Sequence, residues 1–427
     1  MRIAKAQISK QNEQLQASHE SSLNFISARL QEKGKDPETI IQRLMDFQVA
    51  IPSWALGAGG TRFGRFSFGG EPTNLSQKIA DVGLVHALTQ TAGSISLHIP
   101  WDTPEDFDAT RILAESFGLE FDAVNSNTFQ DQSAQSHSYK FGSLCHVDAR
   151  VRNQAIAHNL EVIRIGEGLG SKSLTVWLAD GASFPGQHNM RKALERTMDS
   201  LRQIYAGMPK DWSMFVEYKP YEPNFYSTVI QDWGTSLLLA ESLGPQASCL
   251  VDLGHHLPNT NIEQIVATLL MKGRLGGFHF NDSKYGDDDL TVGSVKPYQL
   301  FLIFQELVDG MEAYGLHASD IAWMIDASHN LKDPLEDLIQ SLDAILIAYA
   351  KALVVDRASL EHAQHACDPT LAQEILQDAY RTDIRPLVRE ARRRTGGAID
   401  PIRTFRSLGI RKQLIAERGE FAVATGL

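Results

Sequence analysis

Carboxylates and imidazoles stand at the ends of four short apolar runs in the second half of the chain. Each run stops at a residue of metal-ligand type, and these residues are Glu217, Asp252, His279 and Asp326. A buried carboxylate without a partner is strongly destabilising, so charges at the ends of apolar strands need a shared cation or substrate. An oxygen-rich shell with an imidazole favours Mn²⁺, Mg²⁺ or Co²⁺ over a metal selected by thiolates. The four residues therefore predict a divalent-cation site.

Three further residues of ligand type follow the same runs, and they are His255, Asp287 and Asp289. All three are expected in loops just beyond the strand ends, where they can converge on a second cation. Either Asp252 or Asp326 could bridge the two cations. The sequence thus predicts two divalent metal ions per chain.

Each of these residues alone would more simply be a turn or helix cap. Asp282 and Asp288, in the same stretch as Asp287 and Asp289, are expected to cap backbone or to point away. Seven ligand-type residues at strand ends or just beyond them rarely arise from capping alone. The joint pattern, and no single residue, therefore indicates a metal centre.

Eight short β-type runs, alternating with helical patterns, must position these residues. The runs lie at 47–54, 94–102, 121–129, 173–180, 214–218, 249–253, 277–280 and 322–326. This alternation predicts an α/β fold, a (β/α)₈ TIM barrel with its active site at the C-terminal rim. The predicted domains are an N-terminal helical segment (1–46), the catalytic barrel (47–332) and a long C-terminal helical extension (333–427).

The flanking segments carry helix signals of their own. Asp36, Pro37 and Glu38 predict an N-cap, a proline at the first helical position and an acidic first turn, for a helix that ends near Asp46. Helical patterns also cover 334–352, 358–365 and 371–394. The basic run at 389–394 is expected on a solvated face or in salt bridges at an interface.

The composition excludes several kinds of partner. A formal net charge of −12 and a pI near 5.6 argue against nucleic acid or an anionic membrane as the main partner. No apolar run reaches the roughly 18 residues of a membrane span, and residues 1–20 lack a signal-like apolar segment. The three cysteines are widely spaced, without a CxxC pair. A reducing cytoplasm is therefore the expected location.

A glycine-rich loop at 57–70 follows the first strand run. It lacks the Gly-Lys-Ser/Thr ending of a phosphate-binding loop. The simpler interpretation is a flexible rim loop. The alternative is a lid in which Phe63, together with Trp54, contacts the ligand.

Six sequence blocks, at 49–54, 96–102, 125–129, 251–256, 277–289 and 324–330, resemble L-rhamnose isomerases, in particular the bacterial branch with broad aldose–ketose specificity. The chain resembles the xylose isomerases more distantly. The resemblance covers nearly the whole length and implies a homotetramer. It implies a structural metal on Glu217, Asp252, His279 and Asp326, and a catalytic metal on His255, Asp287 and Asp289, with Glu217 or Asp252 shared. The chain departs from the pattern at Tyr218, where relatives carry histidine.

This resemblance implies an aldose–ketose isomerase, with L-rhamnose to L-rhamnulose as the leading reaction and L-lyxose, L-mannose and D-allose as further substrates. Two cations, Mn²⁺ first, would hold the open-chain oxygens. Lys219 lies two residues after Glu217 and can donate to O1. His98, or Asp326 with Ser328, could open the sugar ring. Apolar contacts to the sugar are expected from Trp54, Phe63, Phe129 and Trp177.

Two alternatives remain open from the sequence. A ketose 3-epimerase of the same barrel type would use one metal and two carboxylates, and would have no use for His255, Asp287 and Asp289. A catalytically inactive sugar-binding barrel would not need a full ligand set, and all seven ligand positions are occupied here.

Overall fold

The computed structural model describes residues 2–57, 66–133, 135–222, 227–327 and 331–421. Eight parallel strands close into a barrel in the order β1-β10-β9-β8-β6-β4-β3-β2. They are β1 (Ala50–Pro52), β2 (Ser94–Ile99), β3 (Glu120–Ser126), β4 (Ser173–Val176), β6 (Ser213–Glu217), β8 (Ala247–Asp252), β9 (Leu275–Phe280) and β10 (Ala322–Ile325). Each lies within or overlaps one predicted run, so the predicted eight-stranded barrel is confirmed.

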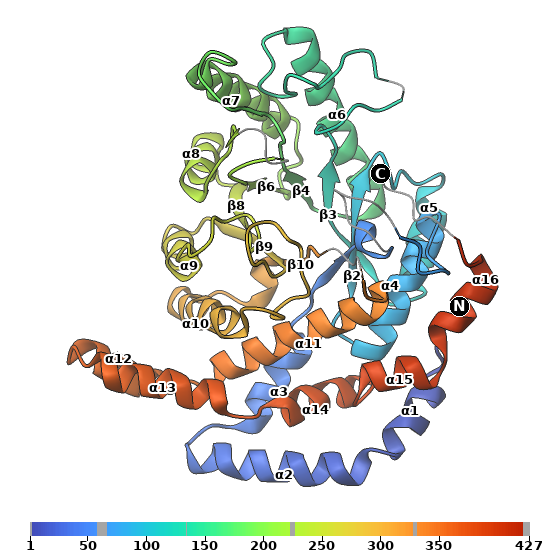
Figure 1. Ribbon diagram of the computed structural model, residues 1–427, viewed down its shortest axis with the longest axis vertical. Coiled ribbons are helices and arrows are strands. Elements are labelled where there is room, and N and C mark those ends of the chain that lie inside the picture. Colours follow the sequence, from blue (N-terminus) through green and yellow to red (C-terminus); the bar gives the residue numbers. More distant parts are fainter. Residues whose placement is uncertain (1, 58–65, 134, 223–226, 328–330, 422–427) are drawn as a thin grey trace.

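A helix follows each barrel strand and covers the outside of the barrel (Figure 1). The eight are α4 (Leu75–Thr89), α5 (Phe107–Glu115), α6 (Ala149–Leu169), α7 (Met190–Ala206), α8 (Trp233–Leu243), α9 (Ile262–Met271), α10 (Pro297–Tyr314) and α11 (Pro334–Leu353). The predicted boundary at residue 333 falls between β10 and α11. Because α11 packs against both α10 and α4, it completes the ring of barrel helices.

Alternation along the strands separates the inside of the barrel from its outside. The outward residues join the large apolar core shared with the helices, whereas Ala123, Phe215 and Leu250 form a separate buried cluster. Side chains two residues apart on a strand share a face. Phe215 therefore lies below Glu217, and Leu250 below Asp252, so this cluster forms an apolar floor under the rim.

A two-stranded antiparallel ribbon, which the sequence did not predict, lies beside the ends of β4 and β6. It pairs β5 (Gly181–Ala182) with β7 (Ser227–Thr228). The backbone N–H of Lys219 donates to the carbonyl of Ile230, 3.0 Å away, just beyond this ribbon. The ribbon thus helps to fix the backbone that carries Lys219.

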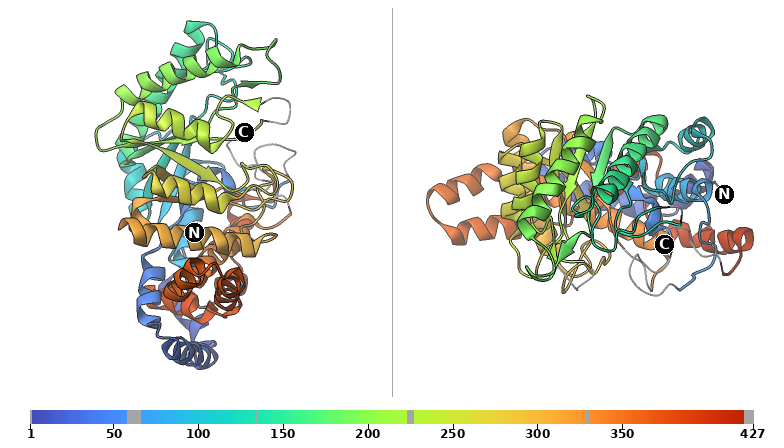
Figure 2. Two further views of the ribbon diagram at one scale, coloured as in Figure 1. Left: turned by 90° about the vertical axis from the view of Figure 1, so that its left-hand side faces the viewer. Right: turned by 90° about the horizontal axis from the view of Figure 1, so that it is seen from above.

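Helices from both ends of the chain form a layer under the barrel (Figures 1 and 2). The N-terminal helices are α1 (Lys5–Glu13), α2 (Gln16–Glu32) and α3 (Pro37–Asp46). The Asp36 side chain accepts from the backbone N–H groups of Glu38 and Thr39, so the predicted cap is confirmed. The C-terminal helices are α12 (Arg357–His365), α13 (Pro369–Arg381), α14 (Arg385–Thr395), α15 (Pro401–Ser407) and α16 (Ile410–Arg418). Of these, α12 and α13 project from the body as a hairpin.

The predicted continuous helix at 371–394 is wrong, because α13 ends at Arg381 and α14 starts at Arg385. Pro386 explains the break: proline has no N–H to donate and is tolerated only in the first turn of a helix, where it lies here.

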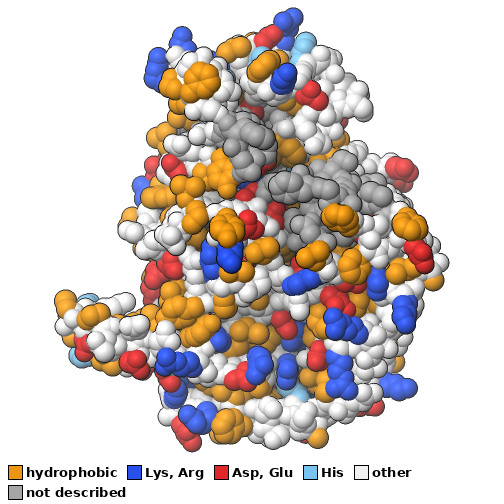
Figure 3. All heavy atoms as spheres, in the orientation of Figure 1, with side chains coloured by type: hydrophobic (Ala, Val, Ile, Leu, Met, Phe, Trp, Pro, Cys, Tyr) orange, Lys and Arg blue, Asp and Glu red, His pale blue; other side chains and the backbone are white. Residues whose placement is uncertain are grey.

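The basic run of α14 lies in ion pairs within the chain. Arg392 is buried and pairs with Asp343 of α11. Arg394 pairs with Glu390 and with Glu38 of α3. Basic and acidic side chains are accordingly interspersed over the lower helical layer in Figure 3. These arginines hold the N- and C-terminal helices together, and the fully solvated alternative is excluded for Arg392.

All three cysteines are free, with Cys145 and Cys249 buried and Cys367 exposed. In the described part of the chain, no single helix is long and apolar enough to cross a membrane. One bent pair, α11 with α12, meets those criteria by length and composition only.

Candidate metal centre

The last inward positions of four neighbouring strands converge at the C-terminal rim. Glu217 and Asp252 end β6 and β8, His279 is the penultimate residue of β9, and Asp326 directly follows β10. The register places Asp252 opposite His279 on the paired strand. Because each of these side chains shares a face with an inward residue two positions earlier, the alternation of the barrel aims them at one point.

These four residues form the inner group, whose ligand atoms all lie within 4.8 Å of one another. Nδ1 of His279 lies 3.5 Å from a Glu217 oxygen, 3.7 Å from an Asp252 oxygen and 3.6 Å from an Asp326 oxygen. This buried nitrogen makes no hydrogen bond to another described residue. Donors that share a divalent cation at about 2.1 Å lie roughly 3 to 3.5 Å apart, so the arrangement fits a common cation.

Asp252, His255 and Asp287 form the outer group, which also meets the 4.8 Å criterion and shares Asp252 with the inner group. Nε2 of His255 lies 3.3 Å from Asp287 and 4.0 Å from Asp252. Nδ1 of His255 is 3.0 Å from the backbone carbonyl of Tyr218. A proton donated from Nδ1 to this carbonyl leaves the Nε2 lone pair facing the two carboxylates, which is the form that binds a metal.

Asp289 lines the cavity beside this centre but belongs to neither group. Its neighbours behave as the sequence predicted. Asp282 accepts from the backbone N–H groups of Val295 and Lys296, and Asp288 accepts from those of Lys284 and Tyr285. These caps shape the loop that brings Asp287 to the outer group.

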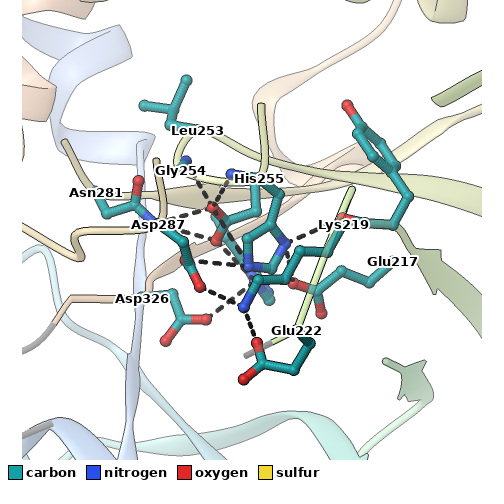
Figure 4. Close-up of polar contacts among 12 residues, drawn as sticks. Glu217, Lys219, Glu222, Leu253, Gly254, His255, Asn281, Asp287 and Asp326 are labelled. Atoms are coloured by element: carbon teal, nitrogen blue, oxygen red, sulfur yellow. Dashed lines mark hydrogen bonds and ion pairs between the residues drawn. The ribbon is translucent and has the colours of Figure 1, made fainter. Parts of the chain in front are cut away.

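Lys219 lies buried at the edge of the outer group and pairs with both Glu222 and Asp287 (Figure 4). Its Nζ also lies 5.3 Å from the centre of the Trp177 ring. One fixed cation thus stands among several buried carboxylates, so the net charge of the centre stays negative.

The pKa values show how strongly these groups depend on one another. Burial favours the neutral form of Glu217, but His279 and His255 outweigh it and hold the Glu217 pKa at about 2. Burial also opposes the charge on His279, yet the nearby carboxylates raise its pKa to about 9. Burial raises the pKa of Asp326 to about 6 and also raises that of Asp252. Too few positive charges face these carboxylates, and divalent cations would supply the missing charge.

An aromatic wall, which includes three of the predicted aromatic residues, closes one side of the cavity. Trp54 and Phe129 each meet His98 edge-on at 5.4 Å, and Phe129 meets Trp177 at 4.8 Å. Trp101, which the sequence analysis did not select, packs on His98 at 4.4 Å. The Trp54 indole N–H donates to Asp326 across 2.9 Å, so this wall also supports the inner group.

His98 is held from below by a buried ion pair. Lys78 and Asp102 lie 2.6 Å apart, and Asp102 also accepts from the backbone N–H of His98 at 2.9 Å. Burial lowers the pKa of His98 to about 3, so its ring is neutral at ordinary pH. Nδ1 of this ring lacks a hydrogen-bond partner in the described part of the protein. A neutral imidazole with a free ring nitrogen can form a hydrogen bond with a ligand in the cavity.

The cavity has a volume of about 190 Å³ and is lined by three residues of the inner group, by His255 of the outer group and by further polar side chains. The sequence analysis missed Ser126 and Thr175, which line this cavity. Their hydroxyls and the indole N–H of Trp177 make no hydrogen bond to another described residue. Buried polar atoms normally have a partner, so free ones around a cavity mark contacts to a ligand. The alternating strand pattern could have identified Thr175, the inward residue before Trp177.

Two predicted site residues, Phe63 and Ser328, lie outside the described residues. The structure therefore brings together the inner group, two residues of the predicted outer set, Lys219, His98 and three of the predicted aromatics. Asp289 lies at the same cavity.

A (β/α)₈ barrel with a carboxylate–imidazole centre beside an aromatic-walled polar cavity defines the class of barrel enzymes whose active site lies at the C-terminal rim. Comparison with known proteins supports this class. A probable sugar isomerase of Mesorhizobium japonicum is 53% identical over 393 residues, which cover 92% of this chain and 91% of that protein. A probable sugar isomerase of Rhizobium meliloti is 52% identical over 398 residues, covering 93% and 92%. The chain belongs to this family of probable sugar isomerases.

More distant comparisons agree with the fold. A xylose isomerase of Thermus thermophilus is 27% identical over 285 residues, covering 61% of this chain and 68% of that protein. The solved structure of an L-ribulose 3-epimerase has a TM-score of 0.52 at 13% identity and covers 75% of this chain and 99% of that chain. A D-allulose 3-epimerase from Methylomonas sp. has a TM-score of 0.50 at 12% identity, covering 69% and 94%. At such identities the structural likeness shows the fold alone. No family model matches the chain.

Proposed function

We propose that this protein is an aldose–ketose isomerase that uses two divalent metal ions, with Mn²⁺ as the preferred ion and Co²⁺ or Mg²⁺ as substitutes. The observation that carries the proposal is the outer group. Asp252, His255 and Asp287 converge next to a complete inner group and share Asp252 with it. A ketose 3-epimerase with one metal would not need this second set of donors.

The bound cations would polarise the sugar oxygens and stabilise negative charge as hydrogen moves between C1 and C2. Lys219 is the buried donor at the edge of the outer group, and its ammonium can hold O1 of the open-chain sugar. This contact strengthens as negative charge develops on the oxygen, which is the condition for a catalytic contribution. Glu222 and Asp287 hold Lys219 in place.

Ring opening requires a proton to leave the anomeric hydroxyl and another to reach the ring oxygen. His98 is neutral and has a free Nδ1, so it is the candidate that can form a hydrogen bond with the sugar hydroxyl during ring opening. Asp326 with Ser328 is the other candidate pair. The hydroxyls of Ser126 and Thr175 can bind sugar hydroxyls, and Trp54, Phe129 and Trp177 can cover its C–H faces.

We further propose L-rhamnose as the principal substrate, with activity on L-lyxose, L-mannose and D-allose. The aromatic wall of the cavity supports a substrate with an apolar C–H face and methyl group. A pocket distinguishes a single methyl group by only about 1–3 kcal/mol, so activity on several related aldoses is expected.

The experiment is a panel of these four aldoses and D-xylose, with kcat/KM measured after chelation and again after Mn²⁺ or Co²⁺ is restored. We expect no activity in EDTA and recovery with either ion. Each ketose is incubated in parallel, and its C3 epimer is sought. Full activity without metal would contradict the metal-dependent reaction, and C3 epimerisation without aldose formation would favour the epimerase.

We also propose that the protein assembles as a homotetramer. The projecting α12–α13 hairpin, whose Leu371 is exposed, is a candidate contact. Light scattering coupled to gel filtration tests this directly: a monomer mass at micromolar concentration would exclude it.

A further inference from the structure

The C-terminal helix α16 joins two segments of the barrel rim that lie far apart in the sequence. The Arg411 guanidinium forms two bonds to Asp333, at 2.6 and 2.7 Å. It also donates to the carbonyl of Gly69 at 3.0 Å. Gly69 lies after β1 and Asp333 lies after β10, so a single side chain spans the junction between the first and last strands.

A second arginine of α16 strengthens the same connection. Arg418 makes a bidentate contact with Asp81 of α4, with both bonds at 2.7 Å, and donates to the Gly70 carbonyl at 3.1 Å. The Arg418 and Asp81 side chains are 3% and 1% exposed, so this pair is inaccessible to water. In addition, the N–H of Gly70 donates to the carbonyl of Gly419 at 2.8 Å. Helix α16 thus holds the segment after β1 by both side chains and backbone.

The junction that α16 spans is the place where the barrel closes, between its first and last strands. β1 and β10 share one register pair, Ala50 with Met324, whereas β10 and β9 share four. Asp326 follows β10 on one side of this junction, and Trp54 follows β1 on the other. The hydrogen bond from Trp54 to Asp326 crosses it at 2.9 Å.

We propose that α16 is a positioning element of the metal centre, in which Arg411 and Arg418 hold the rim segments after β1 and β10 together and thereby hold Trp54 against Asp326. Bidentate guanidinium–carboxylate pairs fix both distance and angle, so they suit this task better than a flexible lysine would. The inference rests on the proposed function only in taking Asp326 as a metal ligand.

Gly70 offers a way to displace α16 without removing a charge. Its φ is +68°, and a Cβ added there would lie 2.6 Å from the backbone carbon of Leu414 in α16. Gly70→Ala should therefore push α16 away from the rim. Gly315→Ala is the matched control, because Gly315 has a φ of +67° with no neighbouring atom within 4 Å of the added Cβ. Both variants carry the same backbone strain, and only Gly70→Ala carries the clash.

Arg411→Gln removes the link between α16 and the segment after β10, with Arg385→Gln as its control. Arg385 of α14 also makes a bidentate pair, with both bonds to Asp383 at 2.7 Å. That pair involves neither rim segment. We expect Gly70→Ala and Arg411→Gln to speed amide hydrogen exchange in the peptides covering 66–71 and 331–335, and the two controls to leave it unchanged.

The deciding readouts are Mn²⁺ affinity and a double-mutant cycle. Trp54 is an outer-shell partner of Asp326, and such partners are worth about 10–100-fold in metal affinity. Because Arg411→Gln should loosen this contact, we expect it to weaken the tighter Mn²⁺ site by up to about tenfold. It should also raise KM for the best aldose more than it lowers kcat. If α16 acts through Trp54, adding Arg411→Gln to the Trp54→Phe variant should lower the Mn²⁺ affinity little further, because the effects of coupled residues are not additive.

Unchanged exchange and Mn²⁺ affinity in Arg411→Gln would overturn the proposal, as would full additivity with Trp54→Phe. If Gly70→Ala does not fold, Arg411→Gln still decides. Hydrogen exchange and Mn²⁺ binding do not depend on turnover, so they test α16 even if the wild-type protein isomerises none of the sugars.

Discussion

The inner and outer groups differ in what holds their ligands. The inner ligands stand at the ends of β6, β8 and β9 and just after β10, so the closed sheet fixes their backbone. The outer group takes His255 and Asp287 from loops, and Asp287 has a left-handed φ of +20°. A site on regular strands is preorganised, whereas a site on loops must order itself when it binds. We therefore expect the inner cation to bind more tightly.

The supporting contacts differ in the same way. Asp326 of the inner group accepts from the Trp54 indole. Asn281 donates at 2.9 and 3.1 Å to Asp252, which both groups share. In the outer group, His255 is oriented by the backbone carbonyl of Tyr218. The inner site can thus be weakened separately by changing Trp54, whereas the outer site is most directly changed at its own ligands.

The largest expected effect comes from Glu217→Gln. Glu217 is buried between His279 and His255, so its loss removes one carboxylate partner from each imidazolium group in the metal-free protein. Breaking a buried charge pair destabilises by about 3–5 kcal/mol. We expect loss of the tighter Mn²⁺ site, a lower Tm and a kcat decrease on the order of 10³-fold or more. Calorimetry with and without Mn²⁺ measures the metal binding and the Tm, and an aldose assay measures kcat. A normal Tm with two bound ions would contradict the role of the inner group.

The outer group is tested by His255→Asn. We expect kcat to fall by on the order of 10²–10⁴, while the fold and the inner cation remain. Asp288→Asn is the control, because Asp288 lies beside Asp287 but accepts only from backbone N–H groups of its own loop. Its turnover should stay close to that of the wild type. If His255→Asn retains near-native kcat with one metal bound, the two-metal reaction is wrong.

The next prediction concerns His98, which packs in the aromatic wall and should make the stability of the protein depend on pH. The pKa of His98 is lowered to about 3 in the folded protein, whereas in the unfolded chain it is about 6.5. Its contribution to stability is therefore complete above pH 6.5 and is lost as the pH falls toward 3. Between pH 6.5 and 5, protonation of the unfolded state costs up to about 2 kcal/mol.

Urea unfolding in EDTA at pH 7.5 and pH 5 measures this loss of stability. We expect His98→Asn to lose less stability on acidification than the wild type. His362→Asn, at an exposed position of α12, is the control and should follow the wild type. Equal acid sensitivity in all three proteins would show that His98 does not remain neutral when folded.

The smallest expected effect comes from Trp54→Phe. Phenylalanine keeps an aromatic face toward His98 but cannot donate to Asp326. Losing an outer-shell partner should weaken the inner cation about tenfold and leave the outer one nearly unchanged. Equal weakening of both sites would mean that the wall supports the centre as a whole.

Alternation and turn chemistry made most of the barrel predictable from the sequence. The positions of Glu217, Asp252 and His279 were predictable for two reasons. Each follows a short apolar run, and parallel strands of a barrel place their carboxyl ends on one rim. The Asp36 cap was equally predictable, because its signal lies within a few residues.

Contacts between distant segments were not predictable. The pairing of Arg411 with Asp333, the polar lining at Thr175 and the support of His98 by Lys78 all depend on how separate elements pack. The break before α14 was missed for a different reason, since Pro386 was present but the charged helical pattern on both sides suggested continuity.

Titration of the metal-free protein with Mn²⁺, monitored by calorimetry and by electron paramagnetic resonance, tests the central claim most directly. We expect two ions per chain with distinct affinities and, at the separation that a shared Asp252 allows, spin coupling between them. His255→Asn should lose the weaker ion and keep the tighter one. A single ion per wild-type chain, or loss of the tighter ion in His255→Asn, would contradict the account.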